Sequence, residues 1–196
     1  MSVPLGRSSA VALALAAASG ASAQGIMTIS WTVGDTGNND GIIVPGESGL
    51  AILWAHMDPM AVGFAGTIYD VVLGGQFGRG TYSFDNYLDE LTNDGTDLGG
   101  GLIAGVESFQ LPPAFNPHFH DPNPLAIGAL TWTPSDFNWD IVTFATANHL
   151  NFDVYTDDFG TSASYEGVVR GGQWVIPTAP TLALFGLGAF RARRRR

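Results

Sequence analysis

The chain has 196 residues, in which 18 aspartates and glutamates outnumber eight arginines, so its formal net charge is −10. This acidic balance excludes nucleic-acid binding, because a phosphate backbone requires a cationic surface. No cysteine is present, which excludes disulfide bonds and a thiol nucleophile and leaves packing as the source of stability.

The first 23 residues have the pattern of a secretory signal peptide. Arg7 is their only charge, an apolar stretch covers residues 10–18, and Ala21-Ser22-Ala23 precedes Gln24. Signal peptidase cleaves after small residues that follow a short apolar segment. We therefore expect residues 1–23 to be a signal peptide, the alternative being a buried N-terminal helix.

Residues 24–175 are expected to form one domain, since about 150 residues suffice for a sizeable core. Six of the eight arginines lie before or after this domain, so Arg79 and Arg170 alone face all 18 acidic residues and the net charge becomes −16. Such a domain repels anionic membranes and stays soluble in salt water.

Alternating residues predict strands along the domain. Met27, Ile29, Trp31 and Val33 alternate with threonines and a serine, which is the period of a strand with one buried face. Eight or nine short strands bounded by Gly, Pro, Asn or Asp predict an all-β fold, a single β-sandwich. The further predicted strands are residues 50–57, 62–73, 102–111, 125–133, 140–147, 150–155, 164–169 and 173–176.

The segment 34–47, Gly-Asp-Thr-Gly-Asn-Asn-Asp-Gly-Ile-Ile-Val-Pro-Gly-Glu, is followed by the strand 50–57 and by the stretch 64–72 with Tyr69-Asp70. It resembles the Asp/Asn/Gly-rich opening, closed by Pro-Gly-Glu, of exported bacterial immunoglobulin-like or cohesin-like sandwiches. The resemblance covers about fifty residues and implies a fold. Cohesins bind dockerins, but these residues identify no dockerin-reading face, so that partner is not carried over.

The same segment is a candidate calcium site. Asp35, Asn38, Asp40 and Glu47 offer hard oxygen ligands, of which calcium takes six to eight. Their spacing is not that of an EF-hand, and Asp or Asn beside Gly is also typical of a tight turn without metal. We expect no cofactor to be required, with calcium at Asp35, Asp40 and Glu47 as the alternative.

One helix and two loops are predicted within the strand-rich part. Phe84, Tyr87, Leu88 and Leu91 have helical spacing behind a possible cap at Ser83, and this pattern predicts a short helix at one end of the sandwich. The glycines of residues 93–101 and the prolines of residues 112–124 predict loops.

The second loop holds a candidate metal site, because His118 and His120 would point to one side of an extended segment near Asp121. The alternative is that these histidines are solvated. Neither a Gly-x-Ser-x-Gly elbow nor a phosphate-binding loop before a helix occurs. We therefore expect no enzyme, with a secreted hydrolase as the less favoured reading.

The five tryptophans raise the possibility of sugar binding through flat aromatic faces. Trp31 and Trp54 stand in apolar alternation and are expected to be buried, whereas Trp139 has polar neighbours and is the candidate ligand-binding residue. The alternative is that all five fill the core.

Residues 176–196 end the chain with Pro177-Thr178-Ala179-Pro180, an apolar run over residues 181–190, and an arginine cluster. This tail resembles a PEP-CTERM sorting signal, the substrate of exosortase-type transpeptidases in bacteria, with Pro177 and Pro180 in the place of its Pro-Glu-Pro motif. An apolar helix from residue 174 to 190 would be about 25 Å long against a hydrocarbon core of ~30 Å, which favours a transient anchor; the alternative is a permanent one. The cationic residues of the signal are Arg193, Arg194, Arg195 and Arg196.

The two ends together predict an exported protein, held transiently in the inner membrane by its C-terminus and placed at the cell surface or in the extracellular matrix. The expected role is structural or adhesive, and the alternative is a carbohydrate-binding module. The expected partners are signal peptidase, an exosortase-like transpeptidase and an extracellular polysaccharide.

Overall fold

A computed structural model describes residues 27–88, 90–138, 140–165 and 167–177. The predicted signal peptide, Trp139, Pro180 and the arginine cluster lie outside these residues, and Pro177 is the last residue described. Within the described part of the chain, no helix is long and apolar enough to span a membrane. The elements are β1 (Thr28–Asp35), β2 (Gly49–His56), β3 (Gly63–Gly75), η1 (Phe77–Arg79), β4 (Gly80–Asn86), β5 (Glu90–Asn93), β6 (Thr96–Asp97), β7 (Leu102–Phe109), η2 (Pro113–Phe115), β8 (Leu125–Pro134), β9 (Asp140–Tyr155), β10 (Ser162–Tyr165), β11 (Val168–Arg170) and β12 (Gly172–Ile176).

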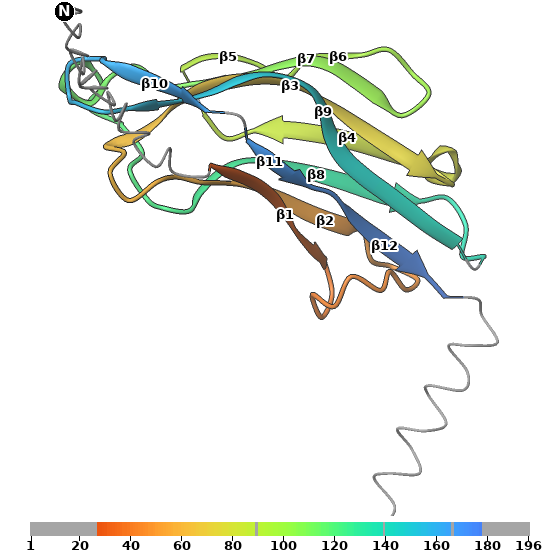
Figure 1. Ribbon diagram of the computed structural model, residues 1–196. Helices are drawn as coiled ribbons and strands as arrows, with labels where there is room; N and C mark the ends of the chain where they lie inside the picture. Colours follow the sequence, from red (N-terminus) through yellow and green to blue (C-terminus); the bar gives the residue numbers. More distant parts are fainter. Residues whose placement is uncertain (1–26, 89, 139, 166, 178–196) are drawn as a thin grey trace, which may run out of the picture.

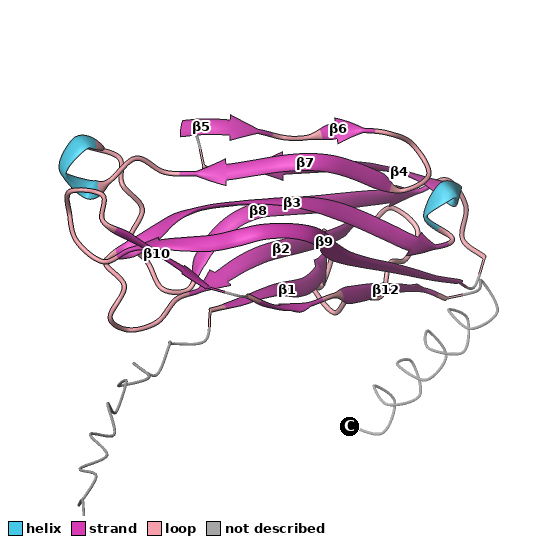
Figure 2. Cartoon of the chain, turned by 45° about the horizontal axis from the view of Figure 1, so that its top comes forward, coloured by secondary structure: helices cyan, strands magenta, loops and turns pink. Residues whose placement is uncertain are grey.

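The strands form two sheets that pack face to face (Figures 1 and 2). The first sheet has the order β11-β1-β2-β8-β4, and the second has the order β10-β9-β3-β7-β5, with β12 added to β9 and β6 added to β7. The paired strands are antiparallel except for β1 and β11, which run parallel. The predicted all-β sandwich is therefore confirmed.

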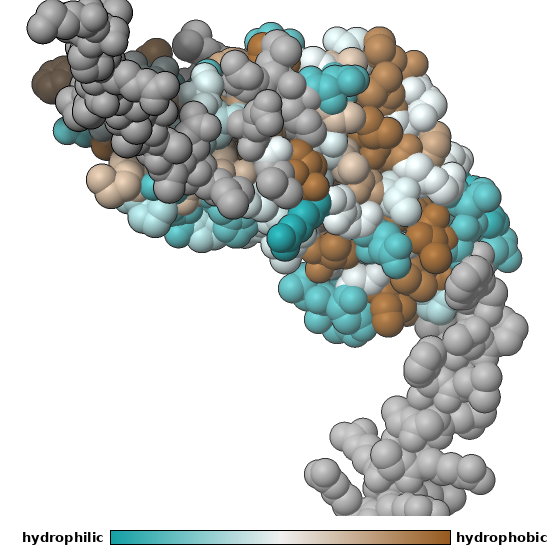
Figure 3. Space-filling view, viewed as in Figure 1, coloured by the Kyte–Doolittle hydropathy of each residue, from teal (hydrophilic) through white to brown (hydrophobic). Residues whose placement is uncertain are grey.

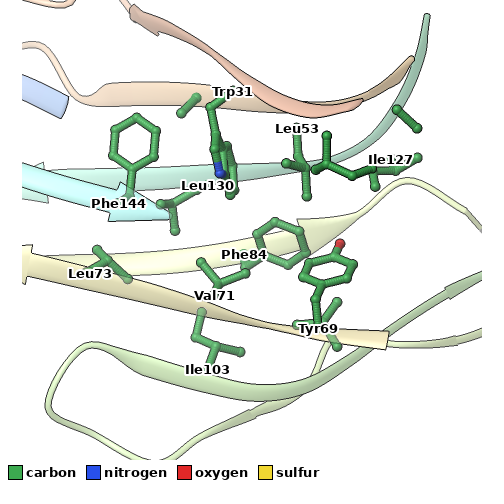
Figure 4. Close-up of a cluster of buried hydrophobic side chains, with 14 of the residues drawn as sticks. Trp31, Leu53, Tyr69, Val71, Leu73, Phe84, Ile103, Ile127, Leu130 and Phe144 are labelled. Atoms are coloured by element: carbon green, nitrogen blue, oxygen red, sulfur yellow. The ribbon is translucent and has the colours of Figure 1, made fainter. Parts of the chain in front are cut away.

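The core fills the space between the sheets. Trp31, Leu53 and Leu130 of the first sheet point toward Val71 and Phe144 of the second (Figure 4). The rings of Trp31 and Phe144 meet edge to face, with centroids 5.3 Å apart, an arrangement that adds to the stabilisation from burial. The alternation seen in the sequence is therefore the alternation between this core and the outer faces.

The loops gather at two opposite ends of the sandwich (Figure 1). One end carries the β2–β3, β7–β8 and β9–β10 connections. The other end carries the β1–β2 loop, η1 and the end of β12. A ligand at the first end would thus lie away from the point where the chain leaves β12.

The predicted helix at residues 84–91 is wrong. Residues 80–86 form β4, which pairs with β8, and β5 begins at Glu90. Between them, the side chain of Asn86 accepts a hydrogen bond from the backbone of Leu88, whose side chain is buried. Pairing with a long neighbouring strand overrides the local helical spacing, because it satisfies the backbone and buries Phe84 at the same time.

Two further predictions differ in detail from the structure. The predicted strands 140–147 and 150–155 join into β9, whose Asn148 takes a positive φ of 50°. The predicted strand 164–169 is divided, because β10 pairs with β9 whereas β11 pairs with β1 in the other sheet. With short pieces of this kind, the described residues contain twelve strands.

Candidate functional site

Asp35 organises the β1–β2 loop. Its side chain is 5% exposed and accepts hydrogen bonds from four backbone N–H groups, those of Gly37, Asn39, Asp40 and Gly41, at 2.7–3.0 Å. Burial raises the pKa of the Asp35 carboxyl, but the four backbone hydrogen bonds together outweigh burial and hold the pKa below its ordinary value.

The other two carboxylates of the calcium prediction also have partners in this loop. Asp40 accepts hydrogen bonds from the backbone of Ile42 and the side chain of Asn38, and Glu47 accepts one from the backbone of Val44. No group of three or more His, Asp or Glu side chains in the described residues is placed to hold a metal ion. Calcium binding would have to draw these carboxylates from their present partners, and it stays a prediction.

The histidine loop is held by its backbone. Gln110, which is buried, accepts a hydrogen bond from the His120 N–H at 2.8 Å and donates to the His120 carbonyl at 3.2 Å. Asn116 accepts a hydrogen bond from the His118 N–H. The side chains of His118 and His120 are themselves exposed, so their backbone bonds give the loop its shape without bringing their imidazoles into a ligand set.

Three tryptophans belong to the core. Trp31 is buried as predicted, and Trp132 and Trp174 are fully buried, with indole nitrogens that donate to the carbonyls of Phe77 and Gly34. Trp54, predicted to be buried, is half-buried on the outer face of β2. Its Nε1 is inaccessible to solvent, and the described residues provide no hydrogen-bond partner for it.

The outer face of the first sheet is almost free of charge. β2 and β8, which form its centre, contain no Asp, Glu, Arg or Lys. The charged residues in its other strands are Asp35, which is buried at the end of β1, and Asp85 and Arg170, in the edge strands β4 and β11. We call this surface the neutral face. It consists of three cross-strand rows, Arg170-Ser30-Trp54-Ala126, Thr32-Ile52-Ala129-Asp85 and Gly34-Leu50-Thr131-Ser83.

The outer face of the second sheet contrasts with the neutral face. Asp70, Glu107 and Asp153 lie on it, one on each of its three central strands β3, β7 and β9. On the side where β9, β12 and β1 run, hydrophobic and hydrophilic residues are interspersed (Figure 3). The acidic residues of the domain therefore lie mainly in loops and on the second sheet, and the centre of the neutral face carries none of them.

A pocket of about 340 Å³ opens at one end of the neutral face. Trp54 contributes from β2, Leu125 and Ala126 contribute from β8, and the segments after β4 and before β8 supply the remaining walls. Its volume lies in the range of small-molecule and side-chain pockets. The residues that line it are Trp54, Tyr87, Leu88, His120, Pro122, Pro124, Leu125 and Ala126.

Comparison with solved structures places this architecture among known sandwiches. A cohesin module from a family 33 glycoside hydrolase of Clostridium perfringens ATCC13124 superimposes with a TM-score of 0.54 at 10% identity, covering 78% of this chain and 98% of the module. The fold is that of a cohesin-like sandwich. The seventh ScaB type I cohesin of Pseudobacteroides cellulosolvens gives a TM-score of 0.51 at 10% identity, with 79% and 94% coverage.

Two other comparisons found nothing. No protein-family model matches the chain, and no curated protein matches it in sequence. The likeness to cohesins therefore concerns the fold alone, and it agrees with the resemblance seen in the segment 34–47.

The pocket was missed by reasoning from the sequence, although one signal for the neutral face was present. The predicted strands 50–57 and 125–133 contain no Asp, Glu, Arg or Lys in a chain with 18 acidic residues. Strands with one solvated face ordinarily carry polar or charged residues there. Recognising that Leu50, Ile52 and Trp54 share the outer face would have required the pairing register.

Proposed function

We propose that this protein is an exported module with a structural or adhesive role at the cell surface or in the extracellular matrix, and that it works through protein–protein contact. The neutral face is the observation that carries this proposal. Apolar area on the surface of a domain is typical of interaction sites, and here Leu50, Ile52 and Trp54 form a half-buried apolar row along β2 in an otherwise acidic domain.

Export rests on the two terminal patterns. A signal peptide at residues 1–23 would deliver the chain across the membrane, and the segment from Pro177 to Arg196 would hold it until an exosortase-like transpeptidase processes it. The cohesin-like fold supports this setting, since it is a fold of modules that join proteins. We propose no catalytic activity for the domain.

Carbohydrate binding is the second candidate function, because Trp54 and Tyr87 line one pocket and aromatic faces can stack on sugar rings. The two functions differ in how the protein is eluted. A matrix protein held by protein contacts should stay in the extracellular polymer when soluble glycans are added, whereas a carbohydrate-binding module should be released by one of them.

The proposal is tested by two matched variants of the full chain. Ile52→Glu places a charge in the middle of the neutral face, and Ile68→Glu places the same charge on the outer face of β3, where Ile68 is also half-buried. We expect Ile52→Glu to lower retention in the extracellular polymer at least fivefold and Ile68→Glu to leave it within twofold. Equal retention of both variants would overturn the proposal, provided that both give the circular dichroism spectrum of the folded protein.

A further inference from the structure

The pocket at the end of the neutral face has a mostly apolar and aromatic lining. Trp54 lies on the outer face of β2 directly opposite Ala126 of β8, and Tyr87 is 40% exposed. Pro122 and Pro124 close the other side. The pocket is thus continuous with the apolar row that runs along β2 from Leu50 to Trp54.

We propose that this pocket binds an apolar or aromatic side chain presented by a basic segment of a partner protein. The inference rests on the proposed function, because it names the chemistry of the partner that the neutral face contacts. Interfaces of this kind concentrate their affinity in one large side chain that enters a pocket with aromatic walls.

The pocket offers few polar groups, which favours an apolar side chain over a sugar. Its polar side-chain groups are the Tyr87 hydroxyl, the His120 imidazole and the Trp54 Nε1, and the last of these is closed to solvent. A sugar ring carries several hydroxyl groups, each of which loses hydrogen bonds to water on entry and requires a replacement. An apolar side chain requires none and gains from burial against Trp54, Leu88 and the two prolines.

The charge around the pocket selects a basic partner. Asp85 is exposed on β4 in the same sheet, and Asp121 is exposed between two residues that line the pocket. Of the two arginines in the expected domain, Arg79 is engaged by Asp136 and Asp140 at 2.6 and 3.2 Å. Arg170 is exposed in the row of Trp54, but it lies two strands away on β11, at the opposite edge of the sheet from Asp85. A second copy of this acidic chain would meet like charges around its own pocket, whereas arginine or lysine beside the inserted side chain would meet opposite ones.

The test measures peptide binding to the full chain in mild detergent at low salt. The probe is a nine-residue peptide with one central tryptophan and four arginines, and its matched controls carry alanine in the centre or glutamates in place of the arginines. Ala126→Trp fills the pocket from β8, and Ala145→Trp makes the same change on the outer side of β9. Tyr87→Ala opens the pocket wall without changing a strand, and so serves if Ala126→Trp does not fold.

We expect the tryptophan–arginine peptide to bind, and its Kd to rise at least tenfold with the alanine peptide, with the glutamate peptide, and in Ala126→Trp or Tyr87→Ala. Ala145→Trp should change the Kd less than twofold. Equal binding of the tryptophan and alanine peptides would overturn the proposal, as would release of the bound peptide by a soluble oligosaccharide or self-association of the chain that Ala126→Trp abolishes. If the peptide fails to bind while Ile52→Glu still lowers matrix retention, the pocket assignment fails and the proposed function stands.

Discussion

A single buried carboxylate gives the β1–β2 loop its shape. Asp35 accepts four backbone hydrogen bonds within six residues of itself, so its negative charge is solvated by the loop instead of by water. The carboxylate thereby replaces the regular strand pairing that this glycine-rich segment lacks. These hydrogen bonds give Asp35 a structural role in the loop, whether or not the loop also binds calcium.

Replacing Asp35 tests this role. Asp35→Asn leaves one acceptor oxygen and turns an amide NH₂ group toward backbone donors, so we expect the free energy of unfolding to fall by about 2–3 kcal/mol. Urea titration measures the change, and Asp58→Asn in an exposed turn should serve as a control with little effect. A loss of less than half a kcal/mol would show that the loop does not depend on the carboxylate.

The stabilisation by Asp35 should also depend on pH. Because the pKa of the folded state lies below the ordinary value of 3.8, the unfolded state takes up a proton first as the pH falls. The difference in unfolding free energy between wild type and Asp35→Asn should therefore be constant from about pH 5 to pH 8 and should shrink as the pH falls through 3.8 toward the folded pKa. Urea titrations across this range measure it, and a difference that grows at low pH would contradict this assignment.

A chelator tests whether the β1–β2 loop binds a metal ion. Calcium at Asp35, Asp40 and Glu47 would add stability that a chelator removes. Since each of the three carboxylates already has backbone partners, we expect the melting temperature to stay unchanged when EDTA is added. A fall of several degrees, reversed by added calcium, would instead establish the metal site.

Gly49 leaves room for the indole ring of Trp174, which packs against its backbone. A Cβ atom at this position would lie 2.5 Å from the indole of Trp174, which is fully buried and held by a hydrogen bond to Gly34. We expect Gly49→Ala to lower the free energy of unfolding by about 1–3 kcal/mol through overpacking. Gly78→Ala is the matched control, since nothing lies within 4 Å of its Cβ; equal losses in both variants would refute the packing argument.

At the scale of elements, β12 closes the sandwich. It pairs with β9 along five residues, its Val175 exchanges backbone hydrogen bonds with Gly41 and Ile43 of the β1–β2 loop, and it buries Trp174 and Ile176. Removing a buried tryptophan alone costs about 3–5 kcal/mol, which is a large share of the stability of a domain. The fold therefore depends on residues up to the start of the C-terminal segment.

Truncation tests this dependence. A chain ending at Pro177 should keep the near-ultraviolet circular dichroism of the full chain and melt within a few degrees of it. A chain ending at Gly171, which lacks β12, should lose this signal and expose Trp132 to quenchers. Cooperative melting of the shorter chain would show that β12 is dispensable.

The elements also show which parts of the fold could be predicted from the sequence. Period-two alternation predicted most of the long strands, because each strand carries one face toward the core. The helix predicted at residues 84–91 failed because Phe84 and Leu88, four residues apart, fit both periods, and pairing with β8, more than forty residues later in the chain, decides between them. The pocket could not be predicted, because residues 54, 87, 120 and 126 come together only in the folded chain. Contacts between residues so far apart leave no local pattern in the sequence.

At the scale of the whole molecule, the dominant property is the excess of acidic charge. A net charge of −16 on the expected domain destabilises the folded state by self-repulsion, and salt screens this repulsion over about 10 Å at 0.1 M. We expect the melting temperature to rise by several degrees between about 10 and 200 mM NaCl. Scanning calorimetry checks this, and a fall over the same range would mean that ion pairs outweigh repulsion.

We place the partner on the neutral face, whose central strands β2 and β8 carry no charged residue. Hydroxyl-radical footprinting of the chain bound to extracellular polymer tests this claim most directly, since it reports which side chains lose contact with solvent. We expect Trp54 and Tyr87 to be shielded on binding, and Phe159, which is 76% exposed at the loop end of the sandwich, to be oxidised as in the free protein. Shielding confined to the outer face of β3, β7 and β9, with Trp54 and Tyr87 unchanged, would contradict it.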